Sequence, residues 1–298
     1  MKKHLRFPRR ILLNSLVSFL VFLMLQHLCL SVHAAGQDQT PSDNIINLLL
    51  IGQDRRESES RARADTLILC TLSPDSGQIT LTSFLRDLYV EIPGHEPNRI
   101  NAAYALGGMP LLKSTFQHNF GITPHGCIEV DFSRFAQIID TLGGVTLELR
   151  QDEAETINKT VPGSLTEGTQ LLNGNQALAY SRIRTLDADG DFSRAARQRK
   201  LIFSLLDSYR NAGLLTILSA AADTLPLIST DLEDRKLLAL AAKLFPLLDS
   251  PQVISQRIPQ EGTYSYETVR NMDVLIADLE AIRGCLKNTQ NNEAAYSP

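Results

Sequence analysis

The sequence predicts an α/β fold, a three-layer α/β/α sandwich with a mixed central β-sheet. Continuous apolar runs, which are typical of strands buried on both faces, occur in the same chain as amphipathic helical patterns. Turn residues separate these elements, and no internal repeat or low-complexity tract interrupts them. One domain over about residues 44–285 is therefore expected, followed by a disordered polar tail over 286–298.

The elements of this domain are predicted in chain order from their apolar spacing. Strands are expected over 45–51, 66–72, 78–84, 89–92, 127–130 and 145–149. Helices are expected over 111–120, 132–142, 193–211, 214–225 and 232–248. A turn over 73–77 joins the second and third strands, and the glycines at 143 and 144 end the helix before the last strand.

The first 36 residues are expected to form a leader outside this domain. Five basic residues lie within the first ten positions, and an apolar run follows over 11–25. Val32-His-Ala34 resembles the cleavage site of a signal peptide, whereas apolar character resuming over 28–32 is the argument for a signal anchor. Both alternatives predict export to the outer face of the cytoplasmic membrane or the cell wall, with 37–43 as a linker.

The exported part of the chain is acidic. After the leader it carries 24 Lys and Arg against 33 Asp and Glu, a balance of −9. Such a surface does not favour binding to nucleic acid or to an anionic membrane. A dense group of arginines within it is therefore expected to be a local binding site.

That group lies in residues 180–200, which contain five arginines and one lysine. On extended backbone, Arg182 and Arg184 would point the same way. On a helix beginning near residue 193, Arg194, Arg197 and Gln198 would share one face. Because the planar guanidinium suits phosphate oxygens, the window predicts a phosphate or diphosphate clamp. The alternative is a solvated helix face whose counter-ions are Asp187, Asp189 and Asp191.

Two aspartates lie at predicted strand ends. Asp54 follows the first strand, and Asp65 opens the second. Ligand sites in α/β sheets gather at strand ends, and one or two carboxylates with substrate phosphates commonly hold Mg²⁺. The alternative is that both aspartates serve turns.

Longer motifs carry a resemblance to a known family. In chain order they are Gly52-Gln-Asp54-Arg55, Ala64-Asp65-Thr66, Ser83-Phe-Leu-Arg86-Asp87, Arg99-Ile-Asn101-Ala-Ala-Tyr104, Val130-Asp131-Phe132, Asp140-Thr-Leu-Gly143-Gly144-Val145, Leu172-Asn173-Gly174, Arg182-Ile-Arg184 and Asp191-Phe-Ser-Arg194-Ala-Ala-Arg197-Gln198. Over this motif core, residues 47–206, the chain resembles the LytR-CpsA-Psr family of extracytoplasmic cell-wall enzymes. It departs from the family pattern at Arg99, commonly Lys, and at Leu85, often Pro.

The resemblance implies a phosphotransferase that moves a glycopolymer from a polyprenyl-diphosphate carrier to peptidoglycan through a phosphodiester link. It implies that Asp54 and Asp65 bind Mg²⁺ or Mn²⁺. The expected catalytic residues around the diphosphate are Arg86, Asp87, Arg182, Arg184, Arg194 and Gln198. Asp87 is a candidate general base, although orienting Arg86 is its favoured role. The expected substrate-binding residues are Arg55, Arg99, Asn101 and Arg197.

Other readings of the same residues stay open. A polyprenyl-diphosphate phosphohydrolase would use water in place of the wall hydroxyl, and a binding protein or regulator of the envelope would carry out no chemistry. The carrier's lipid needs an apolar wall, for which the candidates are Leu111, Leu112, Phe116, Phe135, Ile138, Ile139, Leu201, Ile202, Leu205 and Leu206. Outside the leader, Cys70, Cys127 and Cys285 give no disulfide framework, although one pair could form.

Overall fold

The computed structural model describes residues 45–54, 62–210, 213–233, 235–237, 240, 247 and 252–290. The expected leader and linker lie outside these residues, and the helix expected over 232–248 lies largely outside them.

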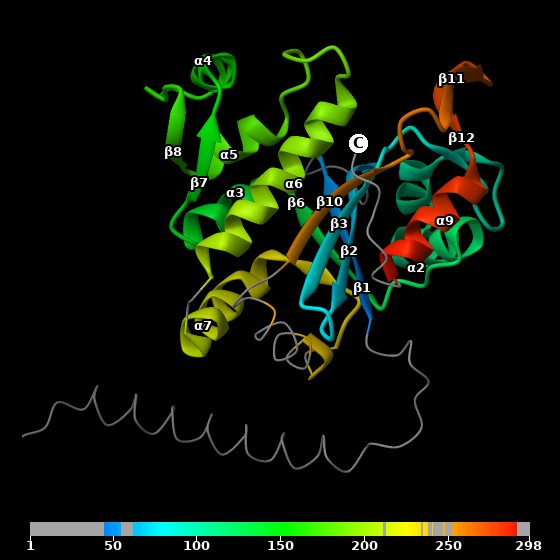
Figure 1. The fold of residues 1–298 in the computed structure, drawn as a ribbon, viewed down its shortest axis with the longest axis horizontal. Coiled ribbons are helices and arrows are strands. Elements are labelled where there is room, and N and C mark those ends of the chain that lie inside the picture. The colour runs from blue at the N-terminus through cyan, green and yellow to red at the C-terminus, as the bar shows by residue number, and fades with distance from the viewer. Residues whose placement is uncertain are drawn as a thin grey trace, which may run out of the picture. The chain divides into compact units, whose positions relative to one another are not determined.

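Six strands form a central mixed sheet (Figure 1). In spatial order they are β10 (Gln252–Ile258), β3 (Gln78–Phe84), β2 (Ala64–Ser73), β1 (Ile46–Gln53), β6 (Gly126–Asp131) and β9 (Ser229–Thr230). The pairs β1–β2, β2–β3 and β6–β9 are antiparallel, whereas β1–β6 and β3–β10 are parallel. Every residue of β3 is buried, as expected for a strand covered on both faces.

Helices cover both faces of this sheet, which confirms the predicted sandwich. Helices α2 (Ile100–Phe120) and α9 (Leu279–Gln290) lie to the right of the sheet in Figure 1, and α6 (Asp191–Ser208) lies to the left. Successive side chains of β1 point to opposite faces of the sheet, so this one strand contributes residues to the cores on both faces. Leu49 and Ile51 pack in the core with α2 and α9, whereas Leu48 and Leu50 belong to the core on the α6 side.

A smaller core lies beside the sheet, on the α6 side. It contains residues of α3 (Phe132–Thr141), α4 (Gln151–Thr160), α5 (Gly174–Ser181), α6 and the hairpin of β7 (Val145–Leu149) and β8 (Gly168–Leu172). Gly174 allows α5 to approach α3 closely, because a Cβ there would lie only 2.0 Å from the carbonyl oxygen of Ala136. This contact places the end of α5 beside the sheet.

The remaining elements are short. They are the hairpin of β4 (Tyr89–Val90) and β5 (Asn98–Arg99), the hairpin of β11 (Tyr264–Val269) and β12 (Met272–Ala277), helix α7 (Leu214–Thr224) and a 3₁₀ turn (Leu225–Leu227). Within the described part of the chain, no helix combines the length and apolar character needed to cross a membrane. Cys70, Cys127 and Cys285 are all free.

Two of the boundaries that differ from the predictions affect the core of the fold. Helix α2 begins at Ile100 rather than at 111, because it contains a kink at Gly108 (φ 65°, ψ −155°) near Pro110 that hides its first turns from a periodicity search. Helix α9 runs to Gln290, so residues 286–290 are not part of a disordered tail. Leu286 is buried in the core beneath α2, which explains why this last helix is ordered.

Candidate functional site

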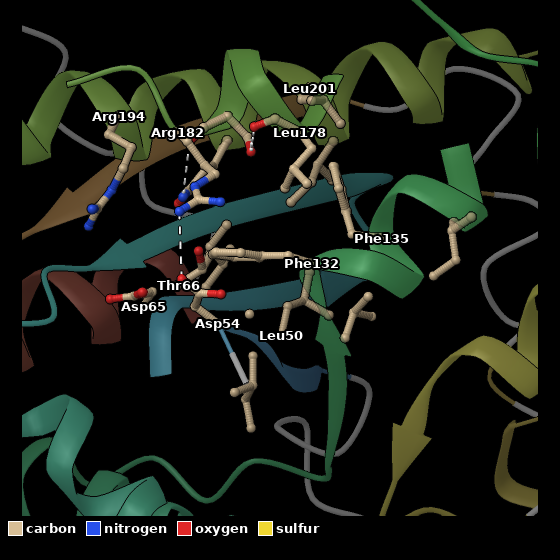
Figure 2. A pocket seen from close by; sticks show the side chains of 18 of the residues that line it. Leu50, Asp54, Asp65, Thr66, Phe132, Phe135, Leu178, Arg182, Arg194 and Leu201 are labelled. Carbon is tan, nitrogen blue, oxygen red and sulfur yellow. Dashed lines mark hydrogen bonds and ion pairs between the residues drawn. The ribbon is translucent and has the colours of Figure 1, made fainter. Parts of the chain in front are cut away.

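A cavity of about 460 Å³ lies between the sheet and helices α3, α5 and α6 (Figure 2). Its two ends differ in chemistry. Asp54, Asp65 and Arg194 lie at one end in Figure 2, and Phe135, Leu178 and Leu201 lie at the other. The cavity therefore offers charge to one part of a ligand and an apolar wall to another part.

The apolar wall agrees only partly with the sequence prediction. Four of the ten candidates line the cavity, namely Phe135, Ile138, Leu201 and Ile202. The other six do not line it and belong only to the cores on either side of the sheet. Strand residues such as Leu50, Ile68 and Ile128 complete the wall, and no sequence pattern separates them from ordinary core residues.

A β-bulge places Asp65 at the polar end. Gly52 pairs with Thr66 and Gln53 pairs with Ala64, so Asp65 is the extra residue of β2. A bulge redirects side chains and is common beside active sites. A Cβ on Gly52 would lie 2.9 Å from Cβ of Thr66, so glycine permits the close pairing of the two strands here.

A buried polar cluster supports the end of β1. The Gln53 amide donates to the Glu129 carboxylate on β6 and accepts from the backbone N–H of Ala62 at 3.2 Å. The Tyr104 hydroxyl donates to the other Glu129 oxygen. These three side chains are buried, so their hydrogen bonds hold the strand end that carries Asp54. Sequence reasoning missed Gln53 and Glu129, because neither stands out in the sequence as part of a pattern.

Arg182 and Arg184 lie on the rim of the cavity. Arg182 caps α5 at φ −102° and ψ −4°, so this backbone is not extended. Its guanidinium lies 4.7 Å from the centre of the Phe132 ring and 3.6 Å from Asp54. Arg184 pairs with Asp191 at 3.4 Å. The two side chains are 53% and 42% exposed, which leaves both able to turn towards a ligand.

Asp191 lies among three guanidinium groups. They belong to Arg86 at 3.0 Å, Arg184 at 3.4 Å and Arg194 at 3.3 Å. Three guanidinium groups this close together repel one another, and in this structure the single carboxylate of Asp191 offsets that repulsion. Arg194 is buried, and its Nε has no hydrogen-bond partner in the described structure, so an unused donor remains beside the cavity.

Arg86 connects Asp65 to this cluster. Its Nη1 lies 2.8 Å from Asp65, and its Nε lies 3.0 Å from Asp191. Burial lowers the pKa of Arg86, but the hydrogen bond to Asp65 and the charges of Asp191 and Asp87 outweigh burial and raise it. Arg86, Asp65, Asp191, Arg194 and Gln198 also line a small hollow beside the main cavity. The expected diphosphate contacts are thus brought together.

Arg197 lies elsewhere, although the sequence predicted it as a substrate contact. It is buried, pairs with Glu153 at 2.8 Å and with Asp187, and donates to the carbonyl of Ile183 at 3.3 Å. Burial lowers the pKa of Arg197, but the hydrogen bonds with Glu153 and Asp187 raise it overall. It does not line the cavity, and its contacts tie α4 to the loop that carries Arg184.

Three further predicted residues, Asp87, Arg99 and Asn101, do not line the cavity either. Asp87 pairs with Arg86 at 3.5 Å and with Arg99 at 3.3 Å. Arg99 also donates to the carbonyl of Asp273 in β12, so these residues link the Arg86 segment to the β11–β12 hairpin. Asn101 is buried in the first turn of α2, and Arg55 lies outside the described residues.

The two aspartates fit a metal only together with a ligand. Asp54 and Asp65 both line the cavity, and nowhere in the described ranges do three or more His, Cys, Asp or Glu side chains form a group that could hold a metal ion. Two carboxylates completed by phosphate oxygens are typical of Mg²⁺. The donor set therefore suits a cation that binds with an anionic substrate.

Comparison with known proteins agrees with this geometry. The model of the LytR_cpsA_psr family matches residues 30–291. The chain belongs to this family. It is 30% identical to the regulatory protein MsrR of Staphylococcus aureus over 226 residues, 75% of this chain and 67% of that protein.

Two further proteins are similar to this chain. The polyisoprenyl-teichoic acid–peptidoglycan teichoic acid transferase TagU of Oceanobacillus iheyensis is 33% identical over 202 residues, 65% of this chain and 61% of that protein. The solved structure of TagT with bound octaprenyl pyrophosphate lipid superimposes with a TM-score of 0.64 and 23% identity, over 86% of this chain and 93% of that one.

Proposed function

We propose that this protein transfers a glycopolymer from a polyprenyl-diphosphate carrier to peptidoglycan, forming a phosphodiester link outside the cytoplasmic membrane. The cavity carries this proposal, because arginines gather at one end and apolar side chains line the other. A diphosphate attached to a long isoprenoid chain has the same division of charge. The lipid bound by TagT and the teichoic acid transfer named for TagU support this assignment.

In the proposed reaction, a hydroxyl oxygen of the acceptor attacks the phosphorus that carries the glycan. The new P–O bond forms as the bond to the bridging oxygen breaks, and polyprenyl phosphate leaves with the bonding electrons. The hydroxyl proton passes to solvent. Arg86, Arg184 and Arg194 stabilise the charge on the phosphate oxygens, since phosphoryl transfer depends mainly on positioning and electrostatics.

We also propose that Mg²⁺ or Mn²⁺ takes part, held by Asp54 and Asp65 together with phosphate oxygens. When bound, such a cation supplies further charge stabilisation to the transferred phosphoryl group. Arg182 and Arg86 form ion pairs with these two carboxylates at 3.6 and 2.8 Å, which keeps both on the rim of the cavity. The basic and apolar leader would hold the protein at the membrane where its lipid substrate lies.

The test uses the full-length chain in detergent with a polyprenyl-diphosphate-linked glycan, soluble peptidoglycan oligomers, and Mg²⁺ or a chelator. Mass spectrometry should show a phosphodiester-joined product that depends on the metal and is lost in Asp65→Asn and Arg184→Ala. Release of phosphate without joining would contradict the transferase and favour the hydrolase. Binding of the carrier without either product would favour a non-catalytic role.

A further inference from the structure

The hairpin β11–β12 carries two tyrosines next to the arginine cluster. Tyr266 is 71% exposed, and its ring lies 5.7 Å from that of Tyr264 in an edge-on arrangement. Tyr264 lies 5.3 Å from Phe192, the residue that follows Asp191 in α6. The hairpin therefore contacts α6 directly beside the arginine cluster. Neither tyrosine lines the cavity described above, which is called the donor cavity from here on.

The hairpin is held firmly to the segment that carries Arg86. The backbone N–H of Leu275 donates to the carbonyl of Asp87 at 2.9 Å, and Leu88 forms a β-bridge with Leu275. Arg99 reaches across from Asp87 to the carbonyl of Asp273. Asp87 and Arg99 therefore have a structural role outside the cavity. Their contacts fix the hairpin that carries Tyr264 and Tyr266 relative to the arginine cluster.

Asp189 and Asp191 lie at the start of α6, next to Phe192, whose ring contacts Tyr264. The pKa of Tyr266 is raised by partial burial first, then by Tyr264 and by the charges of Asp191 and Asp189. Asp189 is itself exposed and accepts a hydrogen bond from Ser193 in the first turn of α6. The exposed face of Tyr266 suits a sugar ring, which presents C–H groups on its faces, and the exposed carboxylate of Asp189 suits the hydroxyl donors at the rim of such a ring.

Positions along helix α6 show on which side of the arginine cluster the two tyrosines lie. Phe192 contacts the hairpin, Arg194 lies in the arginine cluster, and Leu201 lines the apolar end of the cavity. Nine residues of helix span about 14 Å, so the tyrosines and the apolar end lie on opposite sides of the arginines. In-line displacement requires the acceptor to approach opposite the leaving group. The leaving polyprenyl phosphate occupies the apolar end, which leaves the hairpin side for the acceptor.

We infer that Tyr264 and Tyr266 form the acceptor subsite, where a sugar ring of the saccharide acceptor packs against the exposed Tyr266 face. The role as acceptor rests on the proposed transferase function, whereas the binding of a saccharide does not. No residue of the donor cavity is needed for this contact.

The chain contains no Trp, so Tyr266→Trp would introduce a single indole that reports directly on the site. In the full-length Tyr266→Trp protein, soluble peptidoglycan oligomers should change the indole emission in a saturable way. In the transfer assay, Tyr266→Ala should raise the KM for the oligomers about tenfold, with kcat and octaprenyl-diphosphate binding within about twofold of wild type. Tyr266→Phe should restore the KM, and Leu171→Ala, which truncates an exposed side chain on β8, should leave it unchanged.

An unchanged KM in Tyr266→Ala would overturn the subsite, as would emission that does not saturate. Equal losses of donor and acceptor binding would overturn it too, because they would place Tyr266 at the donor site. If wild type yields no joined product, the transferase proposal fails, and the emission titration still decides whether this surface binds saccharide.

Discussion

The rim arginines and Arg197 of α6 lie in the same stretch of sequence, residues 180–200, but have opposite surroundings. Arg182 and Arg184 are about half exposed, and each has one ion pair longer than 3.3 Å. Arg197 is buried between Glu153 and Asp187, with a carbonyl as a third acceptor. The rim pair can exchange its carboxylate partner for a phosphate at small cost, whereas Arg197 cannot. The run of positive charge in the sequence therefore contains two kinds of arginine. Arg182 and Arg184 belong to a candidate binding site, and Arg197 belongs to a buried structural network.

The largest expected effect is on folding, at the buried arginine. Arg197→Met should lower the free energy of unfolding by about 3–5 kcal/mol, because Glu153 would remain buried without its partner. Urea denaturation measures this change. Adding Glu153→Gln to the same chain should recover part of the loss, since it removes the unpaired charge. Wild-type stability in Arg197→Met would show that the two arginine groups do not differ as described.

On the rim, the effect should fall on catalysis. Arg184→Ala should reduce kcat by about 10²–10³-fold, the loss typical when one charge-stabilising donor is removed. Its free energy of unfolding should change by less than about 0.5 kcal/mol, because the side chain is 42% exposed. Arg210→Ala is the matched control, since Arg210 is 47% exposed and pairs only with Asp207 in the described structure. A comparable loss of activity in Arg210→Ala would contradict a specific role for Arg184.

Arg199 extends this comparison, because it is buried and pairs with no carboxylate among the described residues. It donates to Ser255, its Nη1 has no partner in the described structure, and burial followed by the charge of Arg257 lowers its pKa to about 10. Arg199→Met should leave stability unchanged or raise it by about 1 kcal/mol, since an apolar side chain avoids the cost of burying a charge. A loss above about 2 kcal/mol in urea denaturation would show that Arg199 has a stabilising partner.

The smallest effect concerns pH. The pKa of Asp187 is lowered, first by its hydrogen bond with Arg150 and then by that with Arg197. Its stabilising contribution is therefore complete above the unfolded pKa, at about pH 4, and is lost as pH falls through the folded value. Asp187→Asn should lose less unfolding free energy than wild type between about pH 5 and pH 3. If the unfolding free energies of wild type and Asp187→Asn fell in parallel as the pH was lowered, Asp187 would not contribute to the stability of the network around Arg197.

The sequence predicted six of the twelve strands that the structure describes, together with the charged groups, but not the direction of the side chains. The strand over 78–84 and the strand over 145–149 were predicted at their observed bounds, because each has a clear apolar pattern between turn residues. Asp54, Asp65 and the rim arginines were found from strand ends and residue spacing. Spacing alone placed Arg197 on the same helix face as Arg194, and only its carboxylate partners, distant in sequence, show otherwise.

Features that depend on distant pairing could not be predicted. The bulge at Asp65 exists only through the register of β1 against β2, and the Gln53–Glu129–Tyr104 cluster joins three separate elements. The last residues of helix α9, 286–290, were predicted as part of a polar tail, because only a few residues of this helix, including Ile282 and Leu286, face the core. The position of the β11–β12 hairpin beside the arginine cluster depends on its contacts with Asp87 and Phe192, which are far away in the sequence.

The central claim is that the rim arginines bind the diphosphate of a lipid carrier. The most direct measurement is a calorimetric titration of octaprenyl diphosphate into the full-length wild-type chain, Arg184→Ala and Arg210→Ala in the same detergent. We expect saturable binding to wild type and Arg210→Ala, and binding at least about tenfold weaker to Arg184→Ala. Equal affinity in all three proteins would contradict it.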